Sequence, residues 1–450
     1  MRSASTIACR TRHGLTLIEI MIALTMTLIV LGAMMSAFSF ASTQMQLGRS
    51  VMEMANRLRS AEELFRSDLE NLTLDPRSFT ETTLAKGYFE YNEAADRDLD
   101  LSGPIDIANS YQGDIDDSLG LTVRSSGRAF RGRLVNTAVT PNVTTVIESS
   151  LAEVFWYTSS YELTLPVPQS SSNLDLDGDD FVDFEDTLRV HRRVLLIRPD
   201  LGRLLTDVPL AEVNRFIAQN DISVRVVQRN FSDSFDVWAN NLTDLGVRRN
   251  RFAHLHDTFN AGGFLHRFPN PIDPTLLFNR RPHDLNQNPT NSDVLLTDVA
   301  SFDLKVYSIN TNVRVFDASG IFLVAEPSDP GFGDSGGALQ ANGAFVDLGH
   351  AGSGWFSGLP SSQSQLGFVY DTWSPLYESD GVDQDRDGVI DEGTDGIDNG
   401  GTAAPDDSGE RETAPPYPFP IRGMKATFRL IEKKTKQVHQ SSVIQSFVPE

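Results

Sequence analysis

The chain has 450 residues, of which 40% are hydrophobic and 9% are aromatic, so it can bury one large core or two smaller ones. Its formal net charge is −23, and so acidic a surface argues against binding to nucleic acid or to anionic membranes, which requires clustered Lys and Arg. The only cysteine is Cys9, so the chain forms no internal disulfide, and its stability must come from the core or from bound ions.

The N-terminal segment combines a basic stub, a short motif and a long apolar run. The stub carries Arg2, Arg10 and Arg12. The motif, Gly14-Leu15-Thr16-Leu17-Ile18-Glu19, is followed by an apolar run at 20–40 that is long enough to span a bilayer. Because the arginines favour the cytoplasmic side, we expect the chain after about Ser42 to lie outside the inner membrane.

Glu19 is the unusual residue of this segment. A carboxylate at one end of an apolar span costs about 2.5 to 3.5 kcal/mol on insertion scales, so it needs a cationic or hydrogen-bonding partner. The alternative interpretation is an ordinary signal peptide cleaved near Ser39-Phe40-Ala41. An acidic residue within the apolar region is unfavourable for a signal peptide, which argues against that alternative.

The motif resembles the GFTLIE pattern of type IV pilins and type II secretion pseudopilins, with Leu15 where the family usually has Phe. The resemblance implies cleavage after Gly14, before the hydrophobic segment, and N-methylation of the new N-terminal residue, Leu15. It also implies that Glu19, the fifth mature residue, pairs with the N-terminal amine of a neighbouring subunit during assembly. Removal of the leader, with its three arginines, would change the formal charge from −23 to −26.

An amphipathic helix is predicted after the apolar run. Apolar residues recur there at three- and four-residue spacing among charged ones, as Val51, Ala55, Leu58, Phe65, Leu69 and Leu72. Asp75-Pro76 is expected to end the helix. One continuous helix is thus predicted over 15–74, with a transmembrane half at 15–41 and an amphipathic half at 42–74, after a leader at 1–14.

The remainder, 75–450, is predicted to be a β-rich periplasmic domain. Short runs rich in β-branched and aromatic residues occur at 120–124, 152–157, 188–197, 222–227, 299–307 and 425–431. No alternation of helices and strands suggests a parallel sheet. The predicted fold class is therefore α+β and pilin-like, a long N-terminal helix packed on antiparallel sheet, with acidic loop insertions at 173–186 and 326–417.

Three segments, 57–72, 295–307 and 418–447, resemble J-type minor pseudopilins and the related PilW-like minor pilins. A K-type tip subunit fits less well, because that type usually lacks the glutamate retained here as Glu19. The resemblance implies a non-enzymatic subunit at or near the tip of a type II secretion pseudopilus. Its partners would be other major and minor pseudopilins, the prepilin peptidase, the inner-membrane assembly platform and secreted protein cargo. The alternative is a PilW-like minor pilin for adhesion, motility or DNA uptake.

Two acidic segments have the spacing of calcium-binding loops. In the segment 383–395, the expected ligands are carboxylates and one backbone carbonyl, namely Asp383, Asp385, Asp387, Val389, Asp391 and Asp395. Gly388 fits the sharp turn, but Thr394 replaces the usual bidentate Glu, so Glu392 or Asp395 would complete the shell. A solvated acidic linker is the alternative.

The second segment, 175–186, has a comparable set of ligands but Asp180 where glycine is preferred. The expected ligands are Asp175, Asp177, Asp179, Phe181 through its carbonyl, Asp183 and Asp186. A solvated hairpin tip is the alternative. Both segments together predict a structural role for Ca²⁺.

The sequence Gly333-Asp334-Ser335-Gly336-Gly337 is the nucleophile motif of chymotrypsin-like proteases, and a membrane-tethered hydrolase is the alternative from another functional class. A nucleophilic serine needs a general base that a third group orients. None of His191, His254 and His256 lies in an Ala-His-Cys-like segment, which would mark the histidine of such a protease. The sequence also lacks the strand-to-helix turn that presents the serine in G-x-S-x-G hydrolases. A glycine-rich loop and a non-enzymatic protein are therefore expected. A zinc site among His254, His256, His266 and His283 is not expected.

Overall fold

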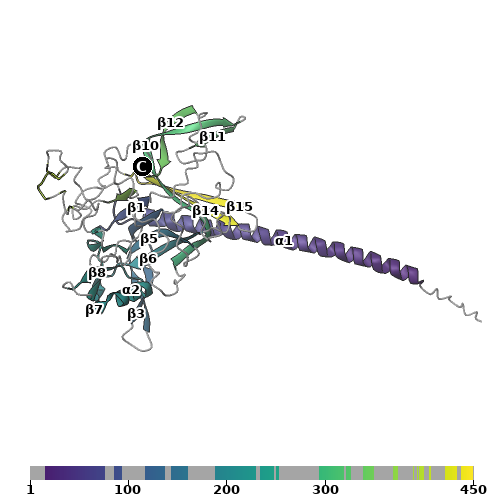
Figure 1. Cartoon of the computed structure of the whole chain (residues 1–450), viewed down its shortest axis with the longest axis horizontal. Coiled ribbons are helices and arrows are strands. Elements are labelled where there is room, and N and C mark those ends of the chain that lie inside the picture. Colours follow the sequence, from purple (N-terminus) through teal and green to yellow (C-terminus); the bar gives the residue numbers. More distant parts are fainter. Residues whose placement is uncertain are drawn as a thin grey trace, which may run out of the picture. The chain divides into compact units, whose positions relative to one another are not determined.

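The computed structural model describes the chain in separate stretches. They are 16–76, 86–93, 117–136, 143–160, 188–229, 234–247, 250–252, 293–318, 321–325, 338–348, 368–372, 389, 393, 395–399, 405–406, 421–432 and 437–448. The chain divides into two units, 1–56 and 57–450, and each is described by itself (Figure 1).

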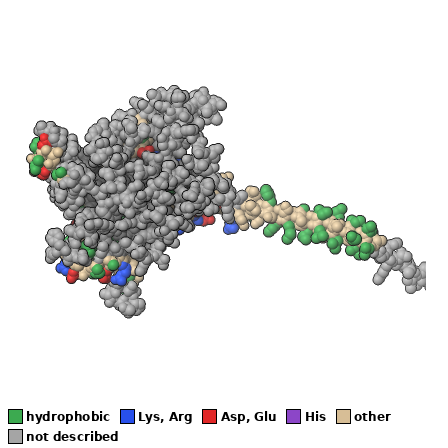
Figure 2. Space-filling model, viewed as in Figure 1, with side chains coloured by type: hydrophobic (Ala, Val, Ile, Leu, Met, Phe, Trp, Pro, Cys, Tyr) green, Lys and Arg blue, Asp and Glu red, His purple; other side chains and the backbone are tan. Residues whose placement is uncertain are grey.

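Helix α1, Leu17–Glu70, begins in the first unit and ends in the second. Between Glu19 and Arg49 it carries no charged side chain. Its large hydrophobic residues from Leu17 to Met45 are each more than half exposed, and Figure 2 shows these green side chains along the helix. A helix that is apolar on all sides requires an apolar environment, and this one is long enough to cross a membrane.

The C-terminal end of α1 differs from the prediction. The helix ends at Glu70 rather than at residue 74, because the next residues pair with strand β2, Ser118–Arg124. The Asn71 carbonyl accepts a hydrogen bond from Arg124 N at 2.8 Å, and Thr73 N donates to the Thr122 carbonyl at 3.0 Å. These backbone bonds cannot form while the same residues remain helical, so tertiary pairing ends the helix before Pro76.

A sheet of ten described strands forms the centre of the second unit, and every pairing in it is antiparallel. Its strand order is β13-β1-β2-β5-β6-β10-β14-β15, with β11 and β12 also paired to β10. Besides β2, the strands are β1 Phe89–Glu93, β5 Leu151–Ser160, β6 Leu188–Leu196, β10 Val294–Ala318, β11 Ile321–Ala325, β12 Ala338–Val346, β13 Phe368–Asp371, β14 Gly423–Glu432 and β15 Gln437–Ser446.

An aromatic cluster packs the C-terminal segment of α1 against this sheet. Phe65, which is fully buried, makes edge-on contacts with Trp156 of β5, Phe302 of β10 and Phe428 of β14, at centroid distances of 5.1, 6.4 and 5.9 Å. Leu58 and Leu69 of the predicted face are buried on the same helix, and so is Ala61, whereas Ala55 of the predicted face is exposed. Edge-to-face contacts contribute about 0.5 to 1.5 kcal/mol per pair beyond area burial.

Asp68 adds a polar anchor beside the aromatic cluster. Its carboxylate accepts two hydrogen bonds from Arg192 of β6, at 2.6 and 2.8 Å, and one from Trp156 Nε1 at 2.9 Å. The side chains of Asp68 and Arg192 are only 5% and 15% exposed. Three donors therefore satisfy the buried carboxylate and fix the helix to two adjacent strands.

A smaller layer covers the other face of β5 and β6. It contains helix α2, Leu210–Gln219, and a three-stranded sheet of β7 Arg203–Pro209, β9 Ser234–Ala239 and β8 Val224–Gln228, in the order β7-β9-β8. Phe155 and Tyr157 of β5 face its core, together with Val213 and Val237. Because Trp156 lies between them in sequence and points to α1, the two faces of β5 serve two cores. The hairpin β3, Phe130–Asn136, and β4, Val143–Ser149, completes the layer.

The α+β fold class is confirmed, and each predicted strand region corresponds to an observed strand. The prediction at 222–227 corresponds to β8, with Ile222 in a separate bridge to Leu196. Of the predicted insertions, 173–186 lies outside the described residues, and so does most of 326–417. The described part of 326–417 differs from a loop insertion, because it contributes strands β12 and β13 to the central sheet.

Asp68→Asn should lower the free energy of unfolding by about 3 kcal/mol, because loss of the charge leaves the largely buried Arg192 guanidinium without its counterion. Glu63→Gln is the matched control, since Glu63 is an exposed acid on the same helical segment and should change stability by less than about 0.5 kcal/mol. Urea unfolding of the detergent-solubilised protein measures both. Equal midpoints for the two variants would show that Asp68 is not an anchor.

Candidate functional sites at the helix start and in an arginine-lined cleft

Glu19 lies in the first turn of α1 and forms a capping box with Thr16, the residue before the helix. Thr16 N and Thr16 Oγ1 each donate a hydrogen bond to Glu19 Oε2 at 2.9 Å, and Glu19 N donates to Thr16 Oγ1 at 3.3 Å. This reciprocal arrangement satisfies backbone donors that a helix start leaves free. The T-x-x-E spacing of Thr16 and Glu19 is a sequence signature of such a cap, which we did not predict for Glu19.

The capping box gives Glu19 a second role beside the expected intermolecular one. Both Thr16 hydrogen bonds end on Oε2, and neither involves Oε1. A cationic group could therefore approach Oε1 while the helix start remains capped. Gly14 and Leu15, the expected cleavage and methylation residues, lie outside the described residues.

The predicted calcium ligands fall almost entirely outside the described residues. All those of the segment 175–186 do so, as do Asp383, Asp385, Asp387 and Asp391. The Asp395 carboxylate caps a local turn, where it accepts hydrogen bonds from Ile397 N at 2.7 Å and Asn399 Nδ2 at 2.9 Å. Within the described stretches, no group of three or more His, Cys, Asp or Glu is arranged to hold a metal ion. Val389 is itself a described residue, but the carboxylates predicted to bind the same ion as its carbonyl are not, except for Asp395.

Ser335 and its glycine neighbours also lie outside the described residues, as do His254, His256, His266 and His283. His191 of β6 is described, and its ring stacks on Tyr157 with centroids 4.7 Å apart. It is 6% exposed, so this histidine belongs to the packed interior of the sheet.

A buried polar cluster surrounds Glu153 of β5. Its carboxylate accepts hydrogen bonds from Tyr88 Oη and Phe252 N, both at 2.8 Å, and from Ser223 Oγ at 2.5 Å. Burial raises the pKa of Glu153, and the hydrogen bond from Ser223 is the largest effect opposing it. Since Tyr88, Ser223 and Glu153 are at most 1% exposed, the cluster joins β5 to neighbouring segments rather than facing a substrate.

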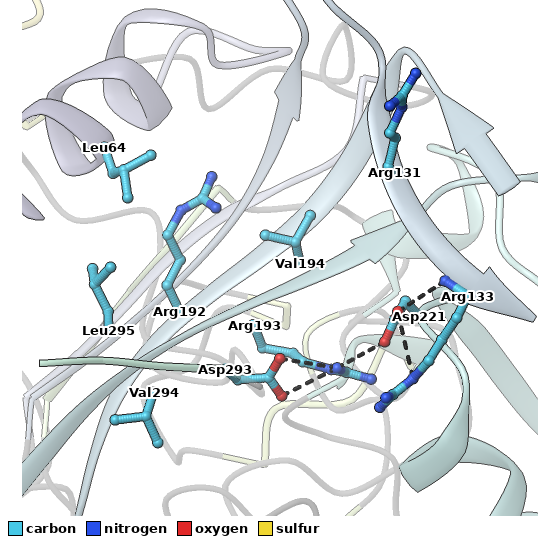
Figure 3. A pocket seen from close by; sticks show the side chains of 10 residues that line it. All are labelled: Leu64, Arg131, Arg133, Arg192, Arg193, Val194, Asp221, Asp293, Val294 and Leu295. Carbon is cyan, nitrogen blue, oxygen red and sulfur yellow. Dashed lines mark hydrogen bonds and ion pairs between the residues drawn. The ribbon is translucent and has the colours of Figure 1, made fainter. Parts of the chain in front are cut away.

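The second unit contains a cleft of about 340 Å³, which we call the arginine cleft (Figure 3). Four arginines line it: Arg131 and Arg133 of β3, and Arg192 and Arg193 of β6. The other lining residues are aliphatic or acidic, namely Leu64 of α1, Val194 of β6, Val294 and Leu295 of β10, Asp221 and Asp293, and Figure 3 shows Arg192 between Leu64 and Leu295. The cleft thus combines four arginines and four aliphatic side chains with two aspartates, in a chain whose net charge is −23.

Two of these arginines are fixed by strong ion pairs. Arg192 makes the paired bonds to Asp68 described above. Arg193, whose side chain is 2% exposed, donates from Nη1 to Asp221 at 3.0 Å and to Asp293 at 3.1 Å, and from Nη2 to the Asn220 carbonyl at 2.9 Å. These contacts explain how the cleft is held open, since they tie β6 to the start of β10 and to the segment after α2.

The two arginines of β3 are held much less firmly. Arg131 pairs with Glu148 of β4 at 2.7 Å, but both side chains are exposed, at 75% and 52%, and such surface pairs contribute about 0 to 1 kcal/mol. Arg133 Nε lies 3.7 Å from Asp221 Oδ2, which is beyond hydrogen-bond distance. Within the described part of the chain, Arg133 Nε and Nη2 have no hydrogen-bond acceptor.

Comparison with protein families gives one match, to the prokaryotic N-terminal methylation motif, over residues 9–35. No curated protein and no solved structure matches the chain. The match indicates a type IV pilin-like prepilin leader, and together with the apolar helix it indicates a membrane-anchored protein with a single pass. Both the predicted cleavage residue, Gly14, and Glu19 lie within the matched residues.

Proposed function

We propose that the protein is a non-enzymatic, J-like minor pseudopilin that assembles at or near the tip of a type II secretion pseudopilus. The observation that carries the proposal is the methylation motif at 9–35, which supports a pilin-like or pseudopilin-like protein. The long apolar helix joined to a large antiparallel domain agrees with the same function. The J-like assignment rests on the resemblance of 57–72, 295–307 and 418–447.

In this proposal the prepilin peptidase removes residues 1–14, and Leu15 becomes the methylated N-terminus. The protein then resides in the inner membrane with its C-terminal domain in the periplasm. The assembly platform extracts α1 from the bilayer, where its exposed apolar side chains pack among the helices of neighbouring pseudopilins. The periplasmic domain would contact other minor pseudopilins and secreted cargo.

Glu19 supplies the electrostatic part of this mechanism. In lipid, its carboxylate is partly satisfied by Thr16, which lowers the cost of holding a charge there. On assembly, Oε1 is the atom available to the N-terminal amine of a neighbour. The capping hydrogen bonds on Oε2 can persist through that exchange, so that the helix start need not unwind.

Glu19→Ala should still insert into the membrane, because removal of the charge removes an insertion cost of about 2.5 to 3.5 kcal/mol. Its cross-linking to other pseudopilins in cells should fall severalfold. Thr16→Val is the matched control, since it removes the hydroxyl of the capping box but retains the Glu19 carboxylate, and its cross-linking should remain close to that of the wild type.

Equal losses in Glu19→Ala and Thr16→Val would mean that Glu19 acts only as a cap of its own helix.

The partners recovered in the same experiment distinguish the two filament systems. Recovery with the pseudopilins of a secretion system supports the proposal, whereas recovery with pilus subunits and a pilus adhesin would favour a PilW-like minor pilin.

We also propose that Ca²⁺ orders the acidic insertions, with ligands in 383–395 and 175–186. The sequence spacing supports this, because four carboxylates in the first segment cannot converge without a cation to offset their repulsion. The mature chain contains no cysteine to hold these loops by other means.

Calcium at about 100 times its Kd should raise the free energy of unfolding by roughly 2.7 kcal/mol. Magnesium should substitute poorly, since it prefers a tighter octahedral shell. Thermal unfolding of the detergent-solubilised protein in calcium and in chelator measures the effect, and Asp383→Ala combined with Asp387→Ala should remove much of it. The same melting temperature in both solutions would contradict calcium binding and would mean that both segments are solvated acidic linkers.

A further inference from the structure

The arginine cleft combines two features that the proposed function does not use. Its guanidinium groups gather in one place on a chain with a net charge of −23, where acidic side chains outnumber basic ones by 61 to 38. The aliphatic residues Leu64, Val294 and Leu295 line the same cleft, together with the carboxylates of Asp221 and Asp293 (Figure 3). A ligand that complements both the weakly paired arginines and the aliphatic residues carries a negative charge next to an aliphatic group.

Arg133 is the residue that most requires a partner. The Asp221 carboxylate already accepts from Arg193 Nη1 at 3.0 Å and from the backbone N–H of Arg133 at 2.9 Å. The Arg133 guanidinium therefore lies at 3.7 Å from an acceptor that is engaged elsewhere, and its Nε and Nη2 donate no hydrogen bond within the described residues. The Arg133 side chain is nevertheless 31% exposed, so a ligand carboxylate can reach its guanidinium from the cleft and supply an acceptor that Asp221 does not.

Arg131 is the other weakly held arginine of β3. It lies two residues before Arg133 on β3, so both side chains leave the strand on the same face. Its ion pair with Glu148 is solvent-exposed, and an incoming carboxylate can compete with it. Arg192 and Arg193 stay in place through their own aspartates and give the cleft its shape.

We propose that the arginine cleft binds an acidic peptide segment, with a glutamate or aspartate carboxylate on Arg133 and Arg131 and an adjacent aliphatic side chain against Leu64, Val294 and Leu295. The cleft volume of about 340 Å³ is at the small end of the range for ligand pockets and suits a few side chains rather than a folded domain. The natural source of the segment is a loop of a neighbouring protein subunit. Planar guanidinium groups favour carboxylates because they donate two parallel hydrogen bonds.

The direct test uses the full-length protein in detergent and two fluorescent peptides with blocked ends, Leu-Glu-Leu and its neutral isostere Leu-Gln-Leu. The Glu peptide should bind at least about ten-fold more tightly, since a charge-assisted hydrogen bond is the difference between them. Fluorescence anisotropy measures both affinities. This assay gives its answer whether or not the chain assembles into a pseudopilus.

Arg133→Gln and Arg131→Gln should each weaken binding of the Glu peptide by about ten-fold and leave the weak Gln peptide unaffected. The control is Arg215→Gln on α2, an exposed arginine with a surface ion pair to Glu212, which should bind like the wild type. If Arg133→Gln fails to fold, Arg131→Gln still decides the question, because its side chain is 75% exposed and does not support the core.

Three results would overturn the proposal. They are equal affinity for the two peptides, no binding of the Glu peptide at millimolar concentration, and unchanged affinity in Arg131→Gln. Inorganic phosphate is the competing probe for a simple anion site. If phosphate displaces the Glu peptide at concentrations similar to those at which the peptide binds, the cleft is a site for a small anion rather than for an acidic peptide.

Discussion

The buried carboxylate of Asp68 is the interaction on which the second unit depends most. A helix that carries a membrane-spanning segment must be fixed firmly to its domain, and an apolar face alone permits sliding along a sheet. Asp68 removes that freedom, because its bonds to Arg192 and to Trp156 reach two adjacent strands and tolerate only one register. Phe65, one turn earlier, fills the aromatic pocket that this register creates.

The same ion pair also shapes the arginine cleft. Arg192 lines the cleft, and it is held by Asp68 on the side of α1. On the next residue, Arg193 points to the opposite face of β6 and is held by Asp221 and Asp293. Two consecutive arginines thus connect the helix, the central sheet and the smaller layer, and they leave the β3 arginines as the weakly held donors at the rim.

Features with a regular period could be predicted from the sequence. The helical spacing of Leu58, Phe65 and Leu69 predicted the buried face of α1, and runs of β-branched residues predicted the central strands. The end of the helix could not be predicted as well, because Asn71 and Thr73 leave it to pair with β2, which lies about 50 residues later. The capping box could have been predicted from the spacing of Thr16 and Glu19. The arginine cleft could not, since its residues come from segments near positions 64, 131, 193, 221 and 293, which are far apart in the sequence and meet only in the folded structure.

The chain carries a prepilin-like leader, and we expect its apolar helix to remain on the mature protein. Mass spectrometry of the N-terminal peptide, from protein purified from membranes of cells with an active prepilin peptidase, tests it most directly. We expect a mature chain that begins with N-methylated Leu15 and retains Glu19 and the whole of α1. A chain that begins near Ser42 would contradict it, since the apolar segment would then be a discarded signal peptide, and so would a chain that keeps residues 1–14.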